Sequence, residues 1–552
     1  MIRKVLKITE TKFTLVIFIG FSFIISILEL ISTAMLISLA DFIQSESITI
    51  PAKILNYLEI LNIKVNEIYY PEIKIVILTI LIFFILKNLL IVLLKKIQID
   101  LIYINQKTLS VLILNLINKA SYLNFSKKKA ETYTNIFIND ISQITNAGLS
   151  SVISLINESF IIIILWSSLM IVYPSETLVI LVFYIPVTFL VTRIISNLSK
   201  KLGDERQKYE IKILELLNSF FLSFKEVKIY SLGKNIVDDF SKIKTKAISI
   251  ASWNSLIQQL NKYIIEIQII VSVTIISVYL DYNFDNIRNF LIAFLFVSIK
   301  IIPSLSIFMT AFSNLKYAEA SYKLTSSTIN QLDEEKKINT NKKNIFSNQG
   351  QIILKNVSFS YDNKVIIKKF NHTFNSGSKT LIIGKSGIGK TTLFNLICKL
   401  IKPNQGSILL PKGGNNNISY CTQSPFIFNE TISRNIHLNN ILDKELMDYS
   451  IEFSLLNDFI KKYDMGINEL LRNNGKNISG GQLKRIALAR AIYASRDILL
   501  LDEVTNGLDL NTKTKILLNL MKSEKTVILI SHDEDIKHYF NNIIDFNEIH
   551  KG

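Results

Sequence analysis

Cysteine is scarce in this chain, and its scarcity excludes two kinds of protein. The 552 residues contain two cysteines, Cys398 and Cys421. Two thiols are too few for the disulfide framework of a small secreted domain, and too few for a metal centre held by clustered cysteines. The sequence therefore indicates neither a disulfide scaffold nor a cysteine-ligated metal.

Acidic residues are outnumbered by basic ones, and the excess is unevenly placed. The chain carries 62 Lys and Arg against 45 Asp and Glu, a formal net charge of +17. Such a balance suits nucleic acid or a membrane surface. Here the lysines crowd the segments between long apolar runs, as at Lys127–Lys129 and Lys200–Lys201. Cytoplasmic loops of membrane proteins show this enrichment, so the charge favours a membrane protein without a nucleic-acid partner.

The first residues do not show the pattern of a cleavable signal sequence. The basic start Met1–Lys4 leads into an apolar run that is too long for a signal-peptide core. No small-residue cleavage site follows this run, so we expect it to stay in the protein as a membrane anchor.

Long apolar runs occur within residues 1–322 and are lacking in residues 323–552. A helix needs about 20 apolar residues to cross the hydrocarbon core of a membrane. Six stretches meet this length, at residues 13–43, 73–94, 148–173, 177–197, 262–280 and 289–313. The lysine-rich connections keep helical periodicity, so we expect the spans to continue as long helices into the cytoplasm.

Two other features of the first part have alternative interpretations. Glu29, Lys87, Glu158 and Lys300 fall inside the expected spans, where a charge facing lipid costs roughly 2.5–3.5 kcal/mol. They are expected either to line a polar translocation path or to form structural ion pairs. The amphipathic pattern of residues 50–70 predicts a helix on the outer membrane surface or one packed against a span.

After the apolar part, residues 323–348 are polar and rich in Asn and Lys. This composition predicts an exposed linker. It separates an expected transmembrane domain, residues 1–322, from a soluble domain, residues 349–552.

The soluble part contains a glycine-rich loop in the setting that phosphate binding requires. Residues Gly384–Thr391 fit the pattern G-x-x-x-x-G-K-[ST], with an apolar strand before them and a helical pattern after them. Backbone N–H groups of such a loop cradle phosphate oxygens, while Lys390 reaches the β- and γ-phosphates and Thr391 ligates Mg²⁺. The predicted nucleotide-binding residues are Gly384, Lys385, Ser386, Gly387, Ile388, Gly389, Lys390, Thr391 and Thr392.

Two buried strands end in residues suited to ATP hydrolysis. The strand Ile498–Leu501 leads into Asp502, which is suited to hold Mg²⁺, and Glu503, which is suited to polarise the attacking water. His532 ends another apolar strand, and Gln423 follows a short one. At the carboxyl edge of an α/β sheet, His532 is expected near the γ-phosphate and Gln423 near Mg²⁺ and the water.

A second anion-binding turn lies further along the chain. Ser479, Gly480, Gly481 and Gln482 open a basic helix, and the N-terminus of a helix attracts anions. Tyr361, upstream of the glycine loop, offers a ring that can stack on a purine.

Taken together, these residues resemble the nucleotide-binding domain of ABC transporters. The matching segments are Gly384–Thr391 (Walker A), Gln423 (Q-loop), Ile478–Gln482 (signature), Asp502–Glu503 (Walker B), Asn506–Asp509 (D-loop), His532 (switch histidine) and Tyr361 (A-loop). Two departures are Asn-Gly in place of the usual Ser-Ala in the D-loop, and a short segment between Gly406 and Gln423.

The resemblance implies a half-transporter of the exporter type. Its fold would be an all-α six-helix transmembrane domain followed by an α/β P-loop ATPase domain with a helical signature subdomain. It implies ATP and Mg²⁺ as ligands, and a homodimer in which Ser479 and Gly481 serve the partner's nucleotide. Coupling turns are implied near residues 122–130 and 212–228. The implied location is the bacterial inner membrane, with the ATPase domain in the cytoplasm.

The cargo is less sharply indicated. Ile27–Ile31 and Phe224–Tyr230 look like segments of the bacterial branch that flips lipid-linked oligosaccharides. Cavity lysines and Arg193 would suit the anionic part of such a lipid. Export of a peptide or a hydrophobic drug is the alternative, because Glu29 and Glu158 would suit a cationic drug. The apolar spans argue against a soluble ABC ATPase of DNA repair or translation, while an ATP-gated channel stays open.

Overall fold

The computed structural model describes residues 12–45, 73–279, 284–339, 346–347, 350–361, 364–438, 441–472 and 478–549. The chain divides into two units. The first comprises Met1–Ala120 and Asn124–Glu335, and the second comprises Ser121–Leu123 and Lys336–Gly552. The amphipathic segment expected over residues 50–70 lies outside the described residues.

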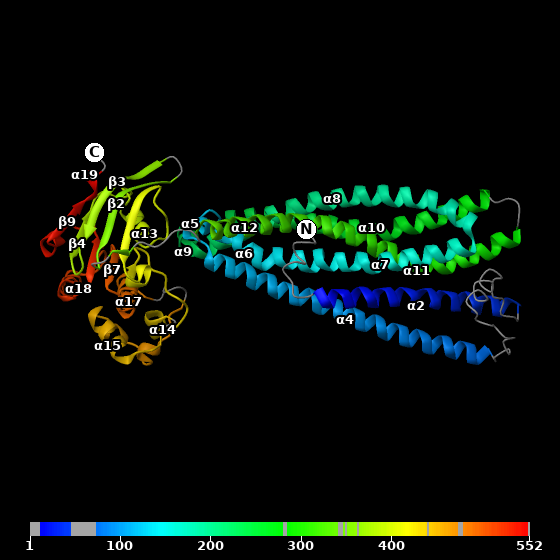
Figure 1. Cartoon of the computed structure of the whole chain (residues 1–552), viewed down its shortest axis with the longest axis horizontal. Coiled ribbons are helices and arrows are strands. Elements are labelled where there is room, and N and C mark those ends of the chain that lie inside the picture. Colours follow the sequence, from blue (N-terminus) through cyan, green and yellow to red (C-terminus); the bar gives the residue numbers. More distant parts are fainter. Residues whose placement is uncertain are drawn as a thin grey trace. The chain divides into compact units, whose positions relative to one another are not determined.

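The first unit is helical, and its main helices are long (Figure 1). In chain order they are α2 (Lys12–Ser45), α4 (Ile73–Lys119), α5 (Tyr122–Ser126), α6 (Ala130–Asn135), the π-helical segments η1 (Ile136–Asp140) and η2 (Gln143–Leu149), α7 (Ser150–Val172), α8 (Pro174–Leu222), α9 (Phe224–Ile229), α10 (Gly233–Tyr279), α11 (Phe284–Tyr317) and α12 (Glu319–Asn339). The longest, α4, α8 and α10, have 47, 49 and 47 residues. At 1.5 Å per residue each is about 70 Å long. As expected, they extend well past the length that crosses hydrocarbon.

Five stretches among the described residues are long and apolar enough to cross a membrane. They are Val16–Leu39, Ile77–Lys119, Ala130–Val172, Pro174–Leu222 and Phe290–Tyr317, and they overlap five of the six expected spans. The remaining expected span, 262–280, falls on α10, whose sequence there includes Lys262, Glu266 and Gln268. The chain is therefore a multi-pass membrane protein, and the count of six spans stays a prediction.

The helices of the first unit pack against one another in several pairs. Helix α10 lies along α8, α11 lies along α7, and α2 contacts both α4 and α7 (Figure 1). Aromatic rings fill part of the shared core, with the Trp166 ring centroid 5.7 Å from that of Tyr184 and 6.4 Å from that of Phe294. This packing buries one side of each helix and leaves many apolar side chains outward, as helices that face lipid require.

The prediction of an exposed linker over 323–348 is wrong for its first part. Helix α12 continues to Asn339, and it buries Thr325, Thr328 and Leu332. Leu324 and Ile329 pack against an apolar cluster that contains Ile113. Apolar residues spaced along one face of a helix are enough to anchor it, even where the average composition is polar.

The second unit contains two sheets. The five-stranded sheet has the order β6-β7-β8-β4-β9, and all its pairings are parallel. Its strands are β4 (Lys379–Ile383), β6 (Ile418–Cys421), β7 (Ile498–Asp502), β8 (Thr526–Ile530) and β9 (Asn542–Asp545). The four-stranded sheet has the order β1-β5-β2-β3, with β2 antiparallel to β3 and β5. Its strands are β1 (Phe346–Ser347), β2 (Ile352–Tyr361), β3 (Lys364–Phe374) and β5 (Gln405–Pro411).

Helices cover both faces of the parallel sheet. They are α13 (Lys390–Ile397), α17 (Gly480–Tyr493), α18 (Leu510–Lys522) and α19 (Phe546–Ile549). Helices α14 (Ile432–His437), α15 (Lys444–Phe453) and α16 (Asn457–Ile460) pack with α17 in an apolar cluster of their own. Short 3₁₀ turns occur at Gly414–Asn417, Gly466–Asn468 and Glu534–Tyr539. Ile382 and Leu500 share a core with α13 and the four-stranded sheet. Their neighbours Leu381 and Leu499 share a core with α17 and α18. Burial on both faces explains why these strands are apolar throughout.

Candidate nucleotide-binding site

The topology of the parallel sheet brings the predicted site residues to one edge. Strands β6, β7, β8 and β4 are successive neighbours and run in the same direction. Gln423, Glu503, His532 and Gly384 each follow the carboxyl end of one of these strands. Because carboxyl ends of parallel strands share an edge, residues far apart in sequence meet there.

The glycine loop has a backbone that side chains would obstruct. Gly389 has φ 111°, and a Cβ added to it would lie 2.6 Å from Ile366 Cγ2. Gly384 has φ 152°, and its added Cβ would lie 3.0 Å from Phe546 Cβ. Only glycine takes such conformations readily, so the loop can pass close to the sheets before α13 begins at Lys390.

Lys390 is buried within this loop. Its Nζ donates hydrogen bonds to the carbonyl oxygens of Gly384 at 2.7 Å and Lys385 at 2.9 Å. It also lies 3.4 Å from His532 Nε2. Burial lowers the pKa of Lys390, although the nearby carboxylates of Glu503 and Asp502 oppose that effect. The ammonium group is therefore already held across the loop, where an anionic phosphate would be its natural partner.

Asp502 lies deeper, under the start of α13. Its Oδ2 accepts a hydrogen bond of 2.8 Å from Thr391 Oγ1 and a longer one, 3.4 Å, from the Tyr420 hydroxyl. Burial raises the pKa of the Asp502 carboxyl, and the hydrogen bond from Thr391 partly offsets this rise. A buried carboxylate beside a hydroxyl is a common ligand set for a divalent cation.

Glu503 is held by three side chains. Its Oε2 accepts hydrogen bonds from Gln423 Nε2 and Asn506 Nδ2, both at 2.9 Å. Its Oε1 lies 3.0 Å from His532 Nε2. The sequence predicts Gln423 near Mg²⁺ and the water and His532 near the γ-phosphate, and the structure places both side chains against Glu503.

The residues present fit a magnesium ion. The Thr391 hydroxyl donates a hydrogen bond to Asp502, so the lone pairs of its oxygen stay available to a cation. The amide oxygen of Gln423 is a third oxygen ligand of the kind that Mg²⁺ accepts, and the ion ordinarily completes its shell with water and phosphate oxygens. Among the described residues no cluster of three His, Cys, Asp or Glu side chains forms a separate metal site.

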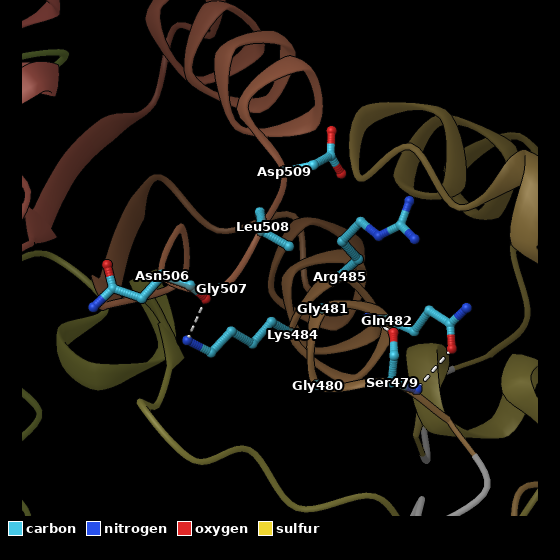
Figure 2. A pocket seen from close by; sticks show the side chains of 10 residues that line it. All are labelled: Ser479, Gly480, Gly481, Gln482, Lys484, Arg485, Asn506, Gly507, Leu508 and Asp509. Atoms are coloured by element: carbon cyan, nitrogen blue, oxygen red, sulfur yellow. Dashed lines mark hydrogen bonds between the residues drawn. The ribbon is translucent and has the colours of Figure 1, made fainter.

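The signature residues form a second feature. Ser479 caps α17: its Oγ accepts from Gln482 N–H at 3.2 Å, and Gln482 Oε1 accepts from Ser479 N–H at 2.8 Å. They line an open pocket of about 610 Å³ (Figure 2). Its lining residues are Ser479, Gly480, Gly481, Gln482, Lys484, Arg485, Asn506, Gly507, Leu508 and Asp509. None of these lining residues belongs to Gly384–Thr392, so this pocket and the glycine loop are separate within one chain.

Other predicted residues have less defined surroundings. Ser386 and Gly387 are exposed at the tip of the loop, and Thr392 is half-buried in α13. Ile388 packs against the core beneath the loop. Tyr361 is 39% exposed and contacts Phe359 edge-on, so its stacking on a base stays a prediction.

Three side chains make contacts in the site that the sequence patterns did not predict. Tyr420 reaches Asp502 from β6, and Asn506 reaches Glu503 from the D-loop. Lys484 donates to the carbonyl oxygens of Glu503 and Asn506. The D-loop departure drew attention to Asn506, but nothing in the order of residues indicated its partner.

Comparison with known proteins identifies the second unit. The family model described as "ABC transporter" matches residues 367–506. Proteins named "ATP-dependent lipid A-core flippase" from Burkholderia pseudomallei (strain 1710b) and Wigglesworthia glossinidia brevipalpis are each 26% identical over 428 residues. These matches span 74% of this chain and 71% and 73% of the relatives. The match extends beyond the ATPase unit into the helical unit.

A solved structure shares the fold of nearly the whole chain. It is described as "Structure of a bacterial Atm1-family ABC exporter with ATP bound" and has a TM-score of 0.74, with 97% of this chain and 93% of that chain covered at 16% identity. The predicted fold class, an α-helical transmembrane part before an α/β ABC ATPase domain, is confirmed. Residues 367–506 are therefore an ABC transporter ATPase domain, and the chain has the fold of an ABC exporter half-transporter, in which binding and hydrolysis of ATP drive transport.

Proposed function

We propose that two copies of this chain form a transporter that flips a lipid-linked oligosaccharide, or a similar glycolipid, across the bacterial inner membrane. The relatives named lipid A-core flippases support this class of cargo. The ATPase domain would lie in the cytoplasm, where ATP is available.

A cluster of charges inside the helical unit carries the substrate proposal. Glu29 Oε2 lies 3.1 Å from Lys87 Nζ and 3.1 Å from Lys300 Nζ. The three residues come from α2, α4 and α11, and both ammonium groups lie over the Phe84 ring. One carboxylate between two ammonium groups leaves one positive charge uncompensated, which suits the phosphate of a lipid-linked glycan.

The same cluster weighs against a cationic drug. Glu29 is occupied by two lysines, and Glu158 is buried and accepts a hydrogen bond from Asn157 at 3.0 Å. Neither carboxylate is left as an open cation site. Arg193 is exposed on α8 and is not among the ion-pair partners of Glu29, so it adds nothing to this cluster.

The residues of the nucleotide site divide the work of hydrolysis. Gly384–Thr391 and Lys390 would bind the phosphates, and Thr391, Gln423 and Asp502 would hold Mg²⁺, which neutralises charge on the phosphates when bound. Glu503 would orient and polarise the attacking water, and His532 would hold the water and Glu503 in place. Ser479–Gln482 would bind the γ-phosphate of ATP held by the partner copy, which accounts for two separate anion-binding turns in one chain.

Stimulation of ATP hydrolysis tests the cargo. The chain is reconstituted in liposomes, and its turnover is measured with lipid-linked glycans, peptides and hydrophobic dyes. We expect stimulation by the glycolipids, and its loss in Lys300→Met, which removes the uncompensated charge but keeps the Glu29–Lys87 pair. Stimulation by dyes or peptides alone would reject the proposed cargo in favour of the alternative.

A further inference from the structure

The turn that carries Glu503 has a strained backbone. Glu503 has φ 52°, in the left-handed region that residues other than glycine rarely occupy. Such a conformation persists where the surrounding structure imposes it, and it is common at functional sites. The Glu503 N–H donates to Ile530 O at 3.0 Å, and its carbonyl accepts from Asn506 N–H at 3.2 Å. The direction of the side chain thus depends on what holds this turn.

Lys484 donates hydrogen bonds to both ends of the turn. Its Nζ donates to the carbonyl oxygens of Glu503 at 2.9 Å and Asn506 at 2.8 Å. Figure 2 shows the side chain extending from α17 across to the Asn506–Gly507 backbone. Within the described part of the chain, no ion pair joins this ammonium to a carboxylate. Its charge is directed at two carbonyl oxygens, where charged donors make strong hydrogen bonds.

The side chain of Asn506 contacts the carboxylate of Glu503. Its Nδ2 donates to Glu503 Oε2 at 2.9 Å, the same oxygen that accepts from Gln423. Asn506 is half-buried, so this bond is partly shielded from water. Lys484 therefore fixes the backbone of Glu503 while Asn506 fixes its carboxylate.

We infer that Lys484 and Asn506 are positioning residues for ATP hydrolysis, which hold Glu503 in the geometry that orients the attacking water. This inference rests on the role proposed for Glu503. Lys484 lies in the first turns of α17, two residues after the signature turn Ser479–Gln482, so its side chain links the helix that carries the signature to the turn that carries Glu503.

Single-turnover and steady-state ATPase assays on the full chain in lipid nanodiscs test this inference. Lys484→Met keeps the length of the side chain and removes its donors, and Asn506→Leu keeps the size and removes the amide. Because a small misplacement of a catalytic group costs up to about 100-fold, we expect kcat to fall about 10- to 100-fold. The KM for ATP should change little, since the phosphate contacts are kept. Lys484→Arg and Asn506→Gln, which keep donors, should restore part of kcat.

Control variants distinguish the loss of positioning from the loss of a charge, from misfolding and from a wrong role for Glu503. Lys515→Met, on an exposed lysine of α18, controls for the loss of a charge, and thermal midpoints confirm that each variant folds. If Lys484→Met does not fold, Asn506→Leu decides the question. Normal turnover in Glu503→Gln would reject the role of Glu503 itself. Inactive Glu503→Gln with normal kcat in the positioning variants, or a raised KM alone, would reject the inference and leave Glu503 in place.

Discussion

At the scale of single residues, the site holds its charged groups in surroundings that favour ligand binding over stability. Asp502 is buried with its charge partly matched by a hydroxyl, and Lys390 is buried against carbonyl oxygens. Both groups are shifted by burial toward their neutral forms, as the raised pKa of Asp502 and the lowered pKa of Lys390 show. Bound Mg²⁺ and phosphate would supply the charges that each lacks.

Asp502→Asn should separate binding from stability. Because the pKa of Asp502 is raised in the folded chain, its contribution to stability is full below the ordinary pKa of aspartate, about 4, and is lost as the pH rises through the raised value. Above that value the charged group destabilises the nucleotide-free domain. We expect Asp502→Asn to melt at the same or a higher temperature, with a larger difference at pH 8 than at pH 5.

Thermal scans with and without Mg-ATP measure both effects. A gain of 1 kcal/mol raises the midpoint by roughly 2–4 °C for a domain of this size. Mg-ATP should raise the thermal midpoint of the variant much less than it raises that of the parent chain. A lower midpoint at both pH values would show that the carboxylate stabilises the domain instead.

Glu503→Gln should abolish turnover while keeping nucleotide binding. The amide keeps the size of the side chain but cannot accept a proton or polarise water as a carboxylate does, so we expect kcat to fall at least about 100-fold. ATP should then stay trapped in a closed dimer, which is measured as labelled ATP that remains bound to the protein after gel filtration. Lys390→Ala is the contrasting variant, because loss of a phosphate contact should weaken binding as well.

At the scale of elements, the packing of the helices depends on close backbone contact as well as on their apolar faces. Gly203 lies in α8, and a Cβ added to it would lie 2.3 Å from the carbonyl oxygen of Tyr317 at the end of α11. The two helices therefore touch backbone to backbone. The Arg206 guanidinium, one turn further along α8, lies over the Tyr317 ring at 4.7 Å.

Gly203→Ala should push these two helices apart. Overpacking of a tight contact costs about 1–3 kcal/mol, so we expect a lower thermal midpoint and weaker coupling of ATP hydrolysis to cargo. Gly20→Ala in α2 is the matched control, because a Cβ there meets nothing within 4 Å. Alanine is the better helix former by about 0.5–1 kcal/mol, so the control should be neutral or slightly stabilised. Equal effects in both variants would contradict the close-contact explanation.

At the scale of the whole molecule, the separation of the glycine loop from the signature pocket predicts sites shared between two chains. A chain with Lys390→Ala lacks the phosphate contact of the loop. A chain with Ser479→Asp keeps the helix cap but places a carboxylate where a phosphate would bind. Each homodimer should be inactive, because both of its sites carry the defect.

Mixed dimers of the two variants should regain activity. One shared site then carries both defects and the other carries neither, so we expect up to about half the parent turnover if the two sites act independently. The test uses two affinity tags and sequential purification, with turnover measured on the doubly tagged species. Activity no higher than that of the homodimers would argue that each chain completes its own site.

Local sequence patterns were enough to predict most of the fold and the nucleotide site of the ATPase unit. The spacing of glycines in Gly384–Thr391 and the apolar strands before Asp502 and His532 are short-range features, and each carries its own physical reason. Parallel strands then bring their carboxyl ends to one edge without further information. The long helices of the first unit were equally accessible, because hydrophobic runs and periodicity are properties of the chain itself.

Contacts between distant segments were decided only by the tertiary structure. The sequence placed Glu29, Lys87 and Lys300 within spans, but only the packing of three helices brings both ammonium groups to one carboxylate. The polar composition of 323–348 concealed a helix, because the few apolar residues that anchor α12 find their partners far away in sequence. The hydrogen bonds from Lys484 to the Glu503 turn also depend on tertiary structure. The side chain on α17 reaches this backbone only after the core between them has packed.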